Sequence, residues 1–171
     1  MATFKTLLVM RHAKSSWKTP GLTDHERPLN RRGERDAVQM AKFLESAKIK
    51  ISRVVASTAR RADMTARALV ATIDCLEPKQ LESRDDFYLA APSVYMSYLQ
   101  ELDDQISGVV LIGHNPGLES LVELLGDSWE TMPTAAIACF DCTATSWSDA
   151  EPSSFRLDHM WRPKEVLEHY R

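Results

Sequence analysis

The chain has 171 residues, enough for one domain with a full hydrophobic core. Hydrophobic residues make up 44% and charged residues 26%, which is ordinary for a globular protein, and the formal net charge of −3 provides no basic field for nucleic acid. No apolar run reaches the length of a membrane span or a signal-peptide core, and three cysteines are too few for a disulfide scaffold. We therefore expect one cytoplasmic domain over residues 1–171, with no membrane or nucleic-acid partner.

The first predicted strand ends in a group of polar residues. Residues 7–10 (LLVM) are apolar without interruption, which is typical of a strand buried on both faces. Arg11 and His12 follow directly, and Lys14 and Ser15 come soon after. In open α/β sheets, ligands bind at the carboxyl ends of the strands. These side chains therefore predict an anion site at the end of this strand.

Helical and strand patterns alternate along the rest of the chain. After a loop over residues 17–30, the predicted elements are a helix over 34–47 capped by Asn30, a strand over 51–57, a helix through 64–71, a short strand or irregular segment over 81–89, a helix from Pro92, a strand over 109–112, a helix over 118–125 and strands over 134–143 and 155–161. The last two strands alternate weakly, as expected of antiparallel or edge strands. This order predicts a doubly wound α/β domain.

Two further strands end in residues that can bind an anion. The strand that ends at Ser57 runs directly into a helix, whose first N–H groups and positive dipole end favour an anion. The strand over 109–112 ends in residues 113–116 (GHNP). Because strand carboxyl ends lie side by side in such a sheet, we expect one shared crevice. The side chains expected there are those of Arg11, His12, Arg61 and His114.

Two arginines and two histidines in one crevice suit phosphoryl transfer. A guanidinium group can bind two phosphoryl oxygens at once. A neutral imidazole nitrogen can attack phosphorus when a hydrogen bond fixes its other nitrogen, and the product is a covalent phosphohistidine that water hydrolyses. Because the arginines neutralise the charge, this chemistry requires no metal and no other cofactor.

Four short boxes occur in a characteristic order along the chain. They are residues 10–15 (MRHAKS), 24–33 (DHERPLNRRG), 57–65 (STARRADMT) and 113–116 (GHNP). Together they resemble the histidine phosphatase superfamily, the phosphoglycerate-mutase-like group, and within it the small SixA-type phosphohistidine phosphatases. The spacing of the third box selects Arg61 rather than Arg60 as the matching arginine.

The resemblance implies a phosphoglycerate-mutase-like fold, a single three-layer α/β/α domain with a mostly parallel central sheet. It also implies roles for the site residues. His12 is then the nucleophile, and Ser15 adds its hydroxyl or its backbone N–H to the phosphate pocket. The other members of that pocket are Arg11, Arg61 and His114.

Many members of this family use a separate carboxylic acid to protonate the leaving group. Asp85 is the first choice for this acid, Asp86 the second, and Glu82 remains possible. An imidazole leaving group has a conjugate acid of pKa about 6.5, so solvent can protonate it near neutral pH. An alkoxide is far more basic and needs a positioned acid. A poorly defined acid is therefore compatible with a phosphohistidine substrate.

The sequence thus predicts a metal-independent phosphohistidine phosphatase that acts through a covalent intermediate on His12. Its partner would be a phosphohistidine-containing protein or a small phosphorylated substrate, and the sequence does not indicate an oligomeric state. One alternative is a phosphatase of small phosphoesters, such as a sugar phosphate or a nucleotide. A second is a non-catalytic module that binds phosphate or phosphohistidine. The presence of a nucleophile argues against this second alternative, because binding alone does not need one.

Overall fold

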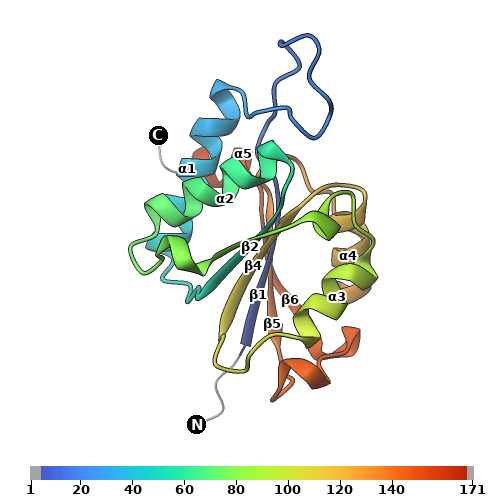
Figure 1. The fold of residues 1–171 in the computed structure, drawn as a ribbon. Coiled ribbons are helices and arrows are strands. Elements are labelled where there is room, and N and C mark those ends of the chain that lie inside the picture. Colours follow the sequence, from blue (N-terminus) through green and yellow to red (C-terminus); the bar gives the residue numbers. More distant parts are fainter. Residues whose placement is uncertain (1–4, 169–171) are drawn as a thin grey trace.

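The computed structural model describes residues 5–168, which form a six-stranded sheet with helices on both faces (Figure 1). The strand order is β3-β2-β4-β1-β5-β6. The strands are β1 (Lys5–Arg11), β2 (Arg53–Ser57), β3 (Leu81–Arg84), β4 (Gly108–Gly113), β5 (Ile137–Cys142) and β6 (Phe155–Trp161). The helices are α1 (Arg31–Ser46), α2 (Arg60–Thr72), α3 (Pro92–Gln100), α4 (Gly117–Gly126) and α5 (Pro163–Glu168), with short 3-10 turns η1 (Pro78–Gln80), η2 (Asp85–Phe87), η3 (Trp147–Asp149) and η4 (Pro152–Ser154).

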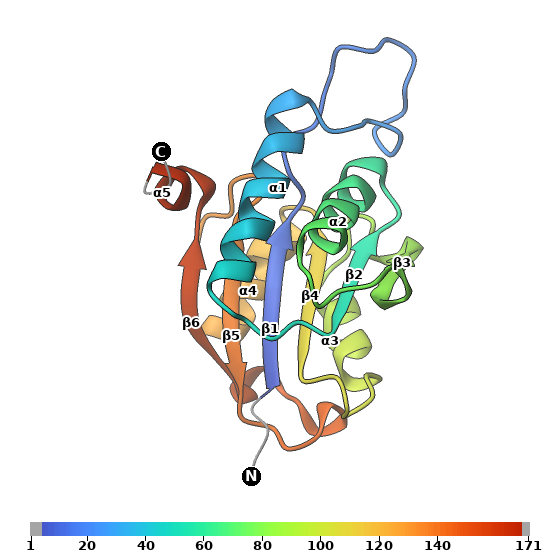
Figure 2. The same cartoon turned by 90° about the vertical axis from the view of Figure 1, so that its left-hand side faces the viewer.

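The sheet is mixed and mostly parallel. β1, β2, β3 and β4 run parallel to one another, and β5 and β6 are antiparallel to their neighbours. Figures 1 and 2 show α1, α2 and α5 on one face of the sheet and α3 and α4 on the other. The predicted three-layer α/β/α architecture is therefore confirmed. No helix within residues 5–168 is long and apolar enough to cross a membrane.

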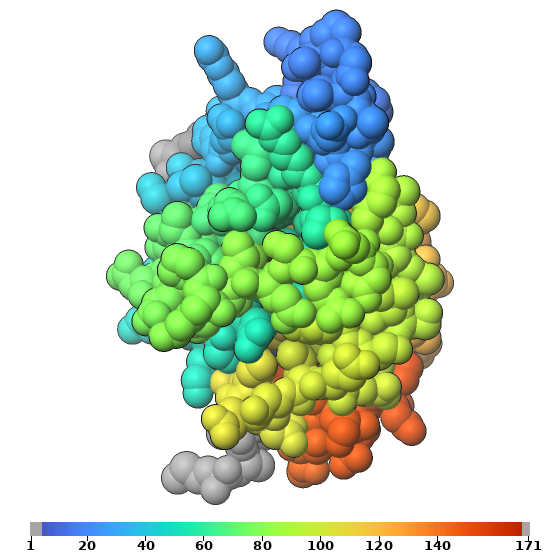
Figure 3. Space-filling model, in the orientation of Figure 1, coloured from blue at the N-terminus to red at the C-terminus, as the bar shows by residue number. Residues whose placement is uncertain are grey.

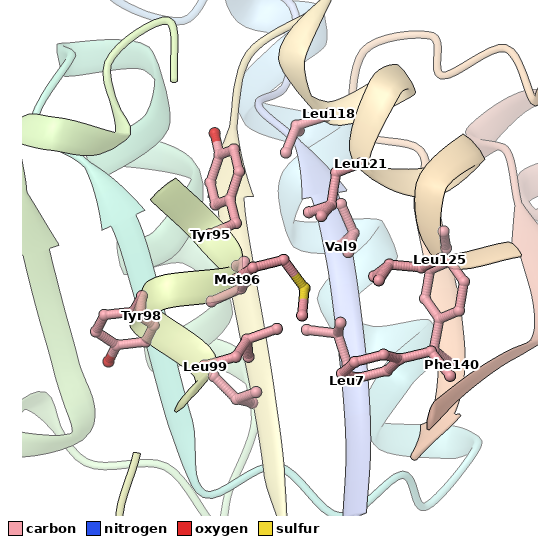
Figure 4. Close-up of a cluster of buried hydrophobic side chains, with 14 of the residues drawn as sticks. Leu7, Val9, Tyr95, Met96, Tyr98, Leu99, Leu118, Leu121, Leu125 and Phe140 are labelled. Carbon is pink, nitrogen blue, oxygen red and sulfur yellow. The ribbon is translucent and has the colours of Figure 1, made fainter. Parts of the chain in front are cut away.

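The alternation of side chains along β1 supplies both halves of the core. Leu7 and Val9 pack on the face that α3 and α4 cover, where Figure 4 shows them close to Met96 of α3 and Leu121 of α4. Leu8 and its neighbours on the opposite face join the cluster beneath α1 and α2. Successive residues of a strand point to opposite faces, so a continuous apolar run is what a strand covered on both sides requires.

The connections of the sheet diverge at the carboxyl ends of β1 and β4. The two strands are parallel neighbours, and Arg11 pairs with Gly113 where they end. From β1 the chain crosses one face through α1 to β2, whereas from β4 it crosses the other face through α4 to β5. A topological switch point of this kind leaves a crevice above the sheet, in which ligands of α/β proteins bind.

Candidate active site

The structure brings three of the predicted pocket residues together at this switch point. His12 follows β1, His114 follows β4, and Arg61 lies in the first turn of α2. All three are buried, with exposed fractions of 7% for His12, 2% for His114 and 4% for Arg61. The ring centroids of the two histidines are 5.0 Å apart. The sheet order explains the grouping, because β4 lies between β1 and β2.

Arg61 donates hydrogen bonds to both histidines and thereby defines their tautomers. Its Nε lies 3.2 Å from Nε2 of His12, and its Nη2 lies 3.2 Å from Nδ1 of His114. A guanidinium group can only donate, so each of these ring nitrogens carries a lone pair. The Nδ1 of His12 donates in turn to the carbonyl oxygen of Ala13, at 2.8 Å. Nε2 of His12 is therefore the nitrogen available for attack.

Ser57, the last residue of β2, fixes the second histidine. The Nε2 of His114 lies 2.9 Å from Oγ of Ser57, and because Nδ1 of this ring accepts from Arg61, Nε2 is the nitrogen that donates. The same hydroxyl oxygen also accepts the backbone N–H of Ala59, at 3.2 Å. Ser57 belongs to the third sequence box, but its contact with His114 was not predicted, because the residues are 57 positions apart.

Both histidines are neutral at physiological pH. Burial lowers the pKa of His12 to about 4, with a further contribution from the positive charge of Arg61. Burial also lowers the pKa of His114 to about 3, and nearby positive charge, including that of Arg11, acts in the same direction. A neutral imidazole keeps the lone pair that a nucleophile needs.

A carboxylate from the loop over residues 12–30 lies against these groups. Asp24 accepts hydrogen bonds from Nη2 of Arg61 at 2.9 Å, Nη1 of Arg27 at 2.7 Å and the hydroxyl of Tyr88 at 2.7 Å. The Tyr88 hydroxyl and the two arginines hold the pKa of Asp24 well below its usual range. Figure 3 shows this loop, in blue, standing above green segments of the chain. The pocket therefore already holds an anionic group.

Arg27 fastens the same loop through the predicted pocket residue Ser15. The hydroxyl of Ser15 accepts from Nη2 of Arg27 at 2.5 Å, and the carbonyl of Ser16 accepts from Nε at 3.1 Å. The guanidinium of Arg27 stacks on the ring of Trp17, and its Cζ atom lies 3.2 Å from the ring centroid. The Trp17 residue is nevertheless 76% exposed. In this arrangement the Ser15 hydroxyl bonds to Arg27 rather than to Arg61 or a histidine.

The three candidate acids lie on β3 and η2. Asp85 is exposed, and within residues 5–168 its carboxylate has no hydrogen-bond or ion-pair partner. The Asp86 carboxylate is paired with Arg84, and that of Glu82 accepts from the Tyr98 hydroxyl at 2.8 Å. The assignment of Asp85 as the acid stays a prediction.

The η2 turn itself reaches the crevice through Tyr88. Its ring lies edge-on to that of His114, with centroids 5.5 Å apart, and edge-on to that of His25, at 4.9 Å. Tyr88 follows a short strand and a 3-10 turn, whose course has no periodic pattern in the sequence. For this reason its place at the site could not be predicted.

Arg11, the last residue of β1, stands apart from this group, because within residues 5–168 it makes no hydrogen bond to His12, Arg61 or His114. Its Nη1 donates to the carbonyl oxygen of Met132 at 2.9 Å, and its Nε is buried with no partner within residues 5–168. No group of three or more His, Cys, Asp or Glu side chains in this part of the chain is arranged to hold a metal ion. The fold and the crevice together define an α/β protein that gathers histidine and arginine at the carboxyl edge of its sheet.

Comparison with known proteins places this arrangement in a family. The sequence profile of the histidine phosphatase superfamily (branch 1) matches residues 7–88, which include three of the four boxes. An uncharacterized chloroplastic protein of Arabidopsis thaliana is 28% identical over 174 residues, covering 95% of this chain and 80% of that protein. An uncharacterized protein of Mycobacterium tuberculosis is 30% identical over 159 residues, covering 86% of this chain and 96% of that protein.

The fold is also shared with a structurally characterised phosphatase. The structure of the protein histidine phosphatase SixA complexed with tungstate superposes with a TM-score of 0.80 at 24% identity, covering 94% of this chain and 99% of that chain. The fold is phosphoglycerate-mutase-like, as predicted. The chain belongs to the histidine phosphatase superfamily, branch 1.

Proposed function

We propose that this chain is a metal-independent phosphohistidine phosphatase with His12 as its nucleophile. The observation that carries the proposal is the hydrogen bonding of His12. Nδ1 holds the proton against the Ala13 carbonyl, so the lone pair of Nε2 faces Arg61 in the crevice. A buried, neutral and oriented imidazole is what attack on phosphorus requires. A module that only binds phosphate does not need an imidazole with a free, oriented lone pair.

The reaction proceeds in two displacements. The phosphoryl oxygens accept hydrogen bonds from Arg61 and Arg11, and Nε of Arg61 thereby releases Nε2 of His12. A bond forms between Nε2 and phosphorus, the N–P bond of the substrate breaks, and the departing imidazole takes a proton. Water then forms a bond to phosphorus, the bond to Nε2 breaks, and inorganic phosphate leaves with His12 neutral again.

The leaving group distinguishes the proposed substrate from phosphoesters. We propose Asp85 as the proton donor for an ester, because an alkoxide needs a positioned acid. An imidazole leaving group, with a pKa of about 6.5, takes its proton from solvent near neutral pH. Asp24 is a poor donor while the arginines and Tyr88 keep it ionised. Phosphohistidine is therefore a substrate that this site can cleave without a positioned acid.

The substrate class is tested by turnover of the purified full chain. A protein phosphorylated on histidine and a panel of sugar phosphates and nucleotides would be supplied, and release of inorganic phosphate measured. We expect rapid release from phosphohistidine and slow release from the esters. Release from esters only would contradict the proposed substrate class.

The covalent mechanism is tested with His12→Ala and a matched variant, His159→Ala, which changes an exposed histidine on β6. We expect His12→Ala to lower turnover by about 10⁴-fold or more and to abolish acid-labile labelling of the chain by phosphate. His159→Ala should retain both. Labelling that persists in His12→Ala would exclude this nucleophile, and phosphate binding without any turnover by the wild type would favour the binding module.

A further inference from the structure

The backbone of Met132 joins α4 to the end of β1. Its N–H donates to Oε1 of Glu119, in the first turn of α4, at 2.9 Å. Its carbonyl oxygen accepts from Nη1 of Arg11 at 2.9 Å and from Nδ2 of Asn115 at 3.0 Å. The two peptide groups that flank the Cα atom of Met132 thus contact a carboxylate on one side and the Arg11 guanidinium on the other.

The backbone of Met132 is held in place by its surroundings. The Met132 residue is 1% exposed and belongs to the core cluster beneath α3 and α4. Three residues further on, the N–H of Ala135 lies 3.1 Å from the carbonyl oxygens of both Arg11 and His12. The segment that carries Met132 is therefore anchored to the end of β1, and its carbonyl has a fixed direction relative to Arg11.

Two polar atoms beside the Met132 carbonyl have no partner within residues 5–168. They are Nε of Arg11 and Oδ1 of Asn115, and both are buried. A buried donor without a partner is costly, and a phosphoryl oxygen is an acceptor that suits Nε of Arg11. Burial lowers the pKa of Arg11, whereas the negative charge of Glu119 favours its charged form. The guanidinium is thus held by one nitrogen while Nε is available.

We infer that Glu119 is a positioning residue, which sets the orientation of the Arg11 guanidinium for phosphoryl binding through the backbone of Met132. The inference rests on the proposed function, because it assigns Arg11 to the incoming phosphoryl group. Glu119 itself does not touch the substrate. It fixes the N–H of Met132, and the carbonyl of the same residue then fixes Arg11.

Single substitutions of Glu119 separate hydrogen bonding from charge. Glu119→Ala should lower kcat for phosphohistidine about tenfold, because the Met132 backbone loses the anchor of its N–H. Glu119→Gln should recover most of this activity, because its amide oxygen can still accept the N–H of Met132. Glu123→Ala is the matched control, since it removes an exposed carboxylate from the same helix. A Glu119→Gln variant as impaired as Glu119→Ala would contradict the positioning of Arg11 through the backbone of Met132.

A double-mutant cycle with Arg11→Ala distinguishes positioning from a general effect on structure. Contacts that act through one another give non-additive changes. We expect Glu119→Ala to change kcat less than twofold when Arg11 is already alanine. An undiminished tenfold loss in that background would overturn the inference.

The same cycle can be run on the affinity for inorganic phosphate, measured by calorimetry, which needs no turnover. We expect Glu119→Ala to weaken phosphate binding in the wild type and to leave it unchanged in Arg11→Ala. If the wild type turned over no substrate but kept this coupling, the proposed function would fail and the role of Glu119 would stand. Additive changes in phosphate affinity would overturn that role even in an active phosphatase.

Discussion

Asp24 places a carboxylate against Arg61, the arginine that the proposed function assigns to a phosphoryl oxygen. It accepts from Nη2 of Arg61, the same nitrogen that contacts His114, and from Arg27 on its other oxygen. Two anions cannot share these donors without strong repulsion. Under the proposed function, an incoming phosphoryl group must therefore displace Asp24 from Arg61 before His12 can attack.

Asp24→Asn should bind inorganic phosphate about fivefold more tightly than the wild type, because the competing charge costs on the order of 1 kcal/mol. Calorimetric titration with phosphate measures this affinity. Glu26→Gln is the control, since that carboxylate lies in the same loop but accepts from Thr23 instead of an arginine. Weaker binding by Asp24→Asn would show that Asp24 orders the arginines rather than competing with the ligand.

The sequence could predict those site residues whose position follows from a strand end. His12 and His114 come directly after β1 and β4, so a correct strand prediction was enough to place them. Asp24 and Tyr88 lie 37 and 27 residues from Arg61 in opposite directions along the chain, on segments without a periodic pattern. Their contacts depend on the course of a loop and a 3-10 turn, which residue types alone do not specify.

At the level of elements, the start of α4 is packed against the connection that carries Tyr88. A Cβ atom on Gly117 would collide with the carbonyl oxygen of Ala90. At the other end of the helix, a Cβ atom on Gly126 would meet side-chain atoms only at ordinary distances, the nearest at 3.5 Å. One helix therefore contains both a glycine that close packing requires and a glycine that it does not.

Gly117→Ala should lower the free energy of unfolding by about 1–3 kcal/mol, because the backbone must move to admit the methyl group. It should also reduce turnover, because Ala90 is two residues from Tyr88, which packs against His114. Gly126→Ala should be neutral or stabilising by up to about 1 kcal/mol, since alanine favours the helix. Urea denaturation and phosphate release measure the two effects. Equal stability of both variants would contradict the packing argument.

The succession of elements followed from the sequence pattern, and the deviations have local causes. Strand β6 has the predicted bounds, and Asn30 caps α1 by accepting the N–H of Gly33 at 2.8 Å. The helix nevertheless begins at Arg31, three residues before the predicted start, because its first turn is polar and lacks the apolar pattern. Residues 147–154, between the last two predicted strands, form η3 and η4, with Trp147 buried and its indole donating to the carbonyl oxygen of Ile106.

For the molecule as a whole, the buried neutral histidines make stability depend on pH. The pKa values of His12 and His114 are about 4 and about 3 in the folded state, against about 6.5 in the unfolded chain. Below pH 6.5 the unfolded state therefore binds more protons, and stability falls with decreasing pH until the folded pKa values are reached. Asp24 makes stability depend on pH in a lower range. Its pKa in the folded state lies below the unfolded value, so stability falls further as the pH decreases below about 4.

The free energy of unfolding should therefore decrease from pH 6.5 towards pH 4, with each histidine contributing at most about 1.4 kcal/mol per pH unit. Urea denaturation at a series of pH values measures this slope. His12→Gln should have a shallower slope, because one titrating group is removed, whereas His159→Ala, which changes an exposed histidine, should keep the wild-type slope. A wild-type slope in His12→Gln would contradict a buried neutral His12.

The position of β4 between β1 and β2 also has a consequence for how the chain folds. His12 and Arg61 are 49 residues apart in sequence, and Arg61 and His114 are 53 apart. Each contact closes a long loop, and parallel pairings of this kind form slowly because the entropy of closure is lost before the contacts compensate for it. The first half of the chain can form β1, α1 and β2, yet the gap between the two strands stays open until β4 enters it. A refolding chain therefore regains the crevice that holds His12, Arg61 and His114 no sooner than its global fold.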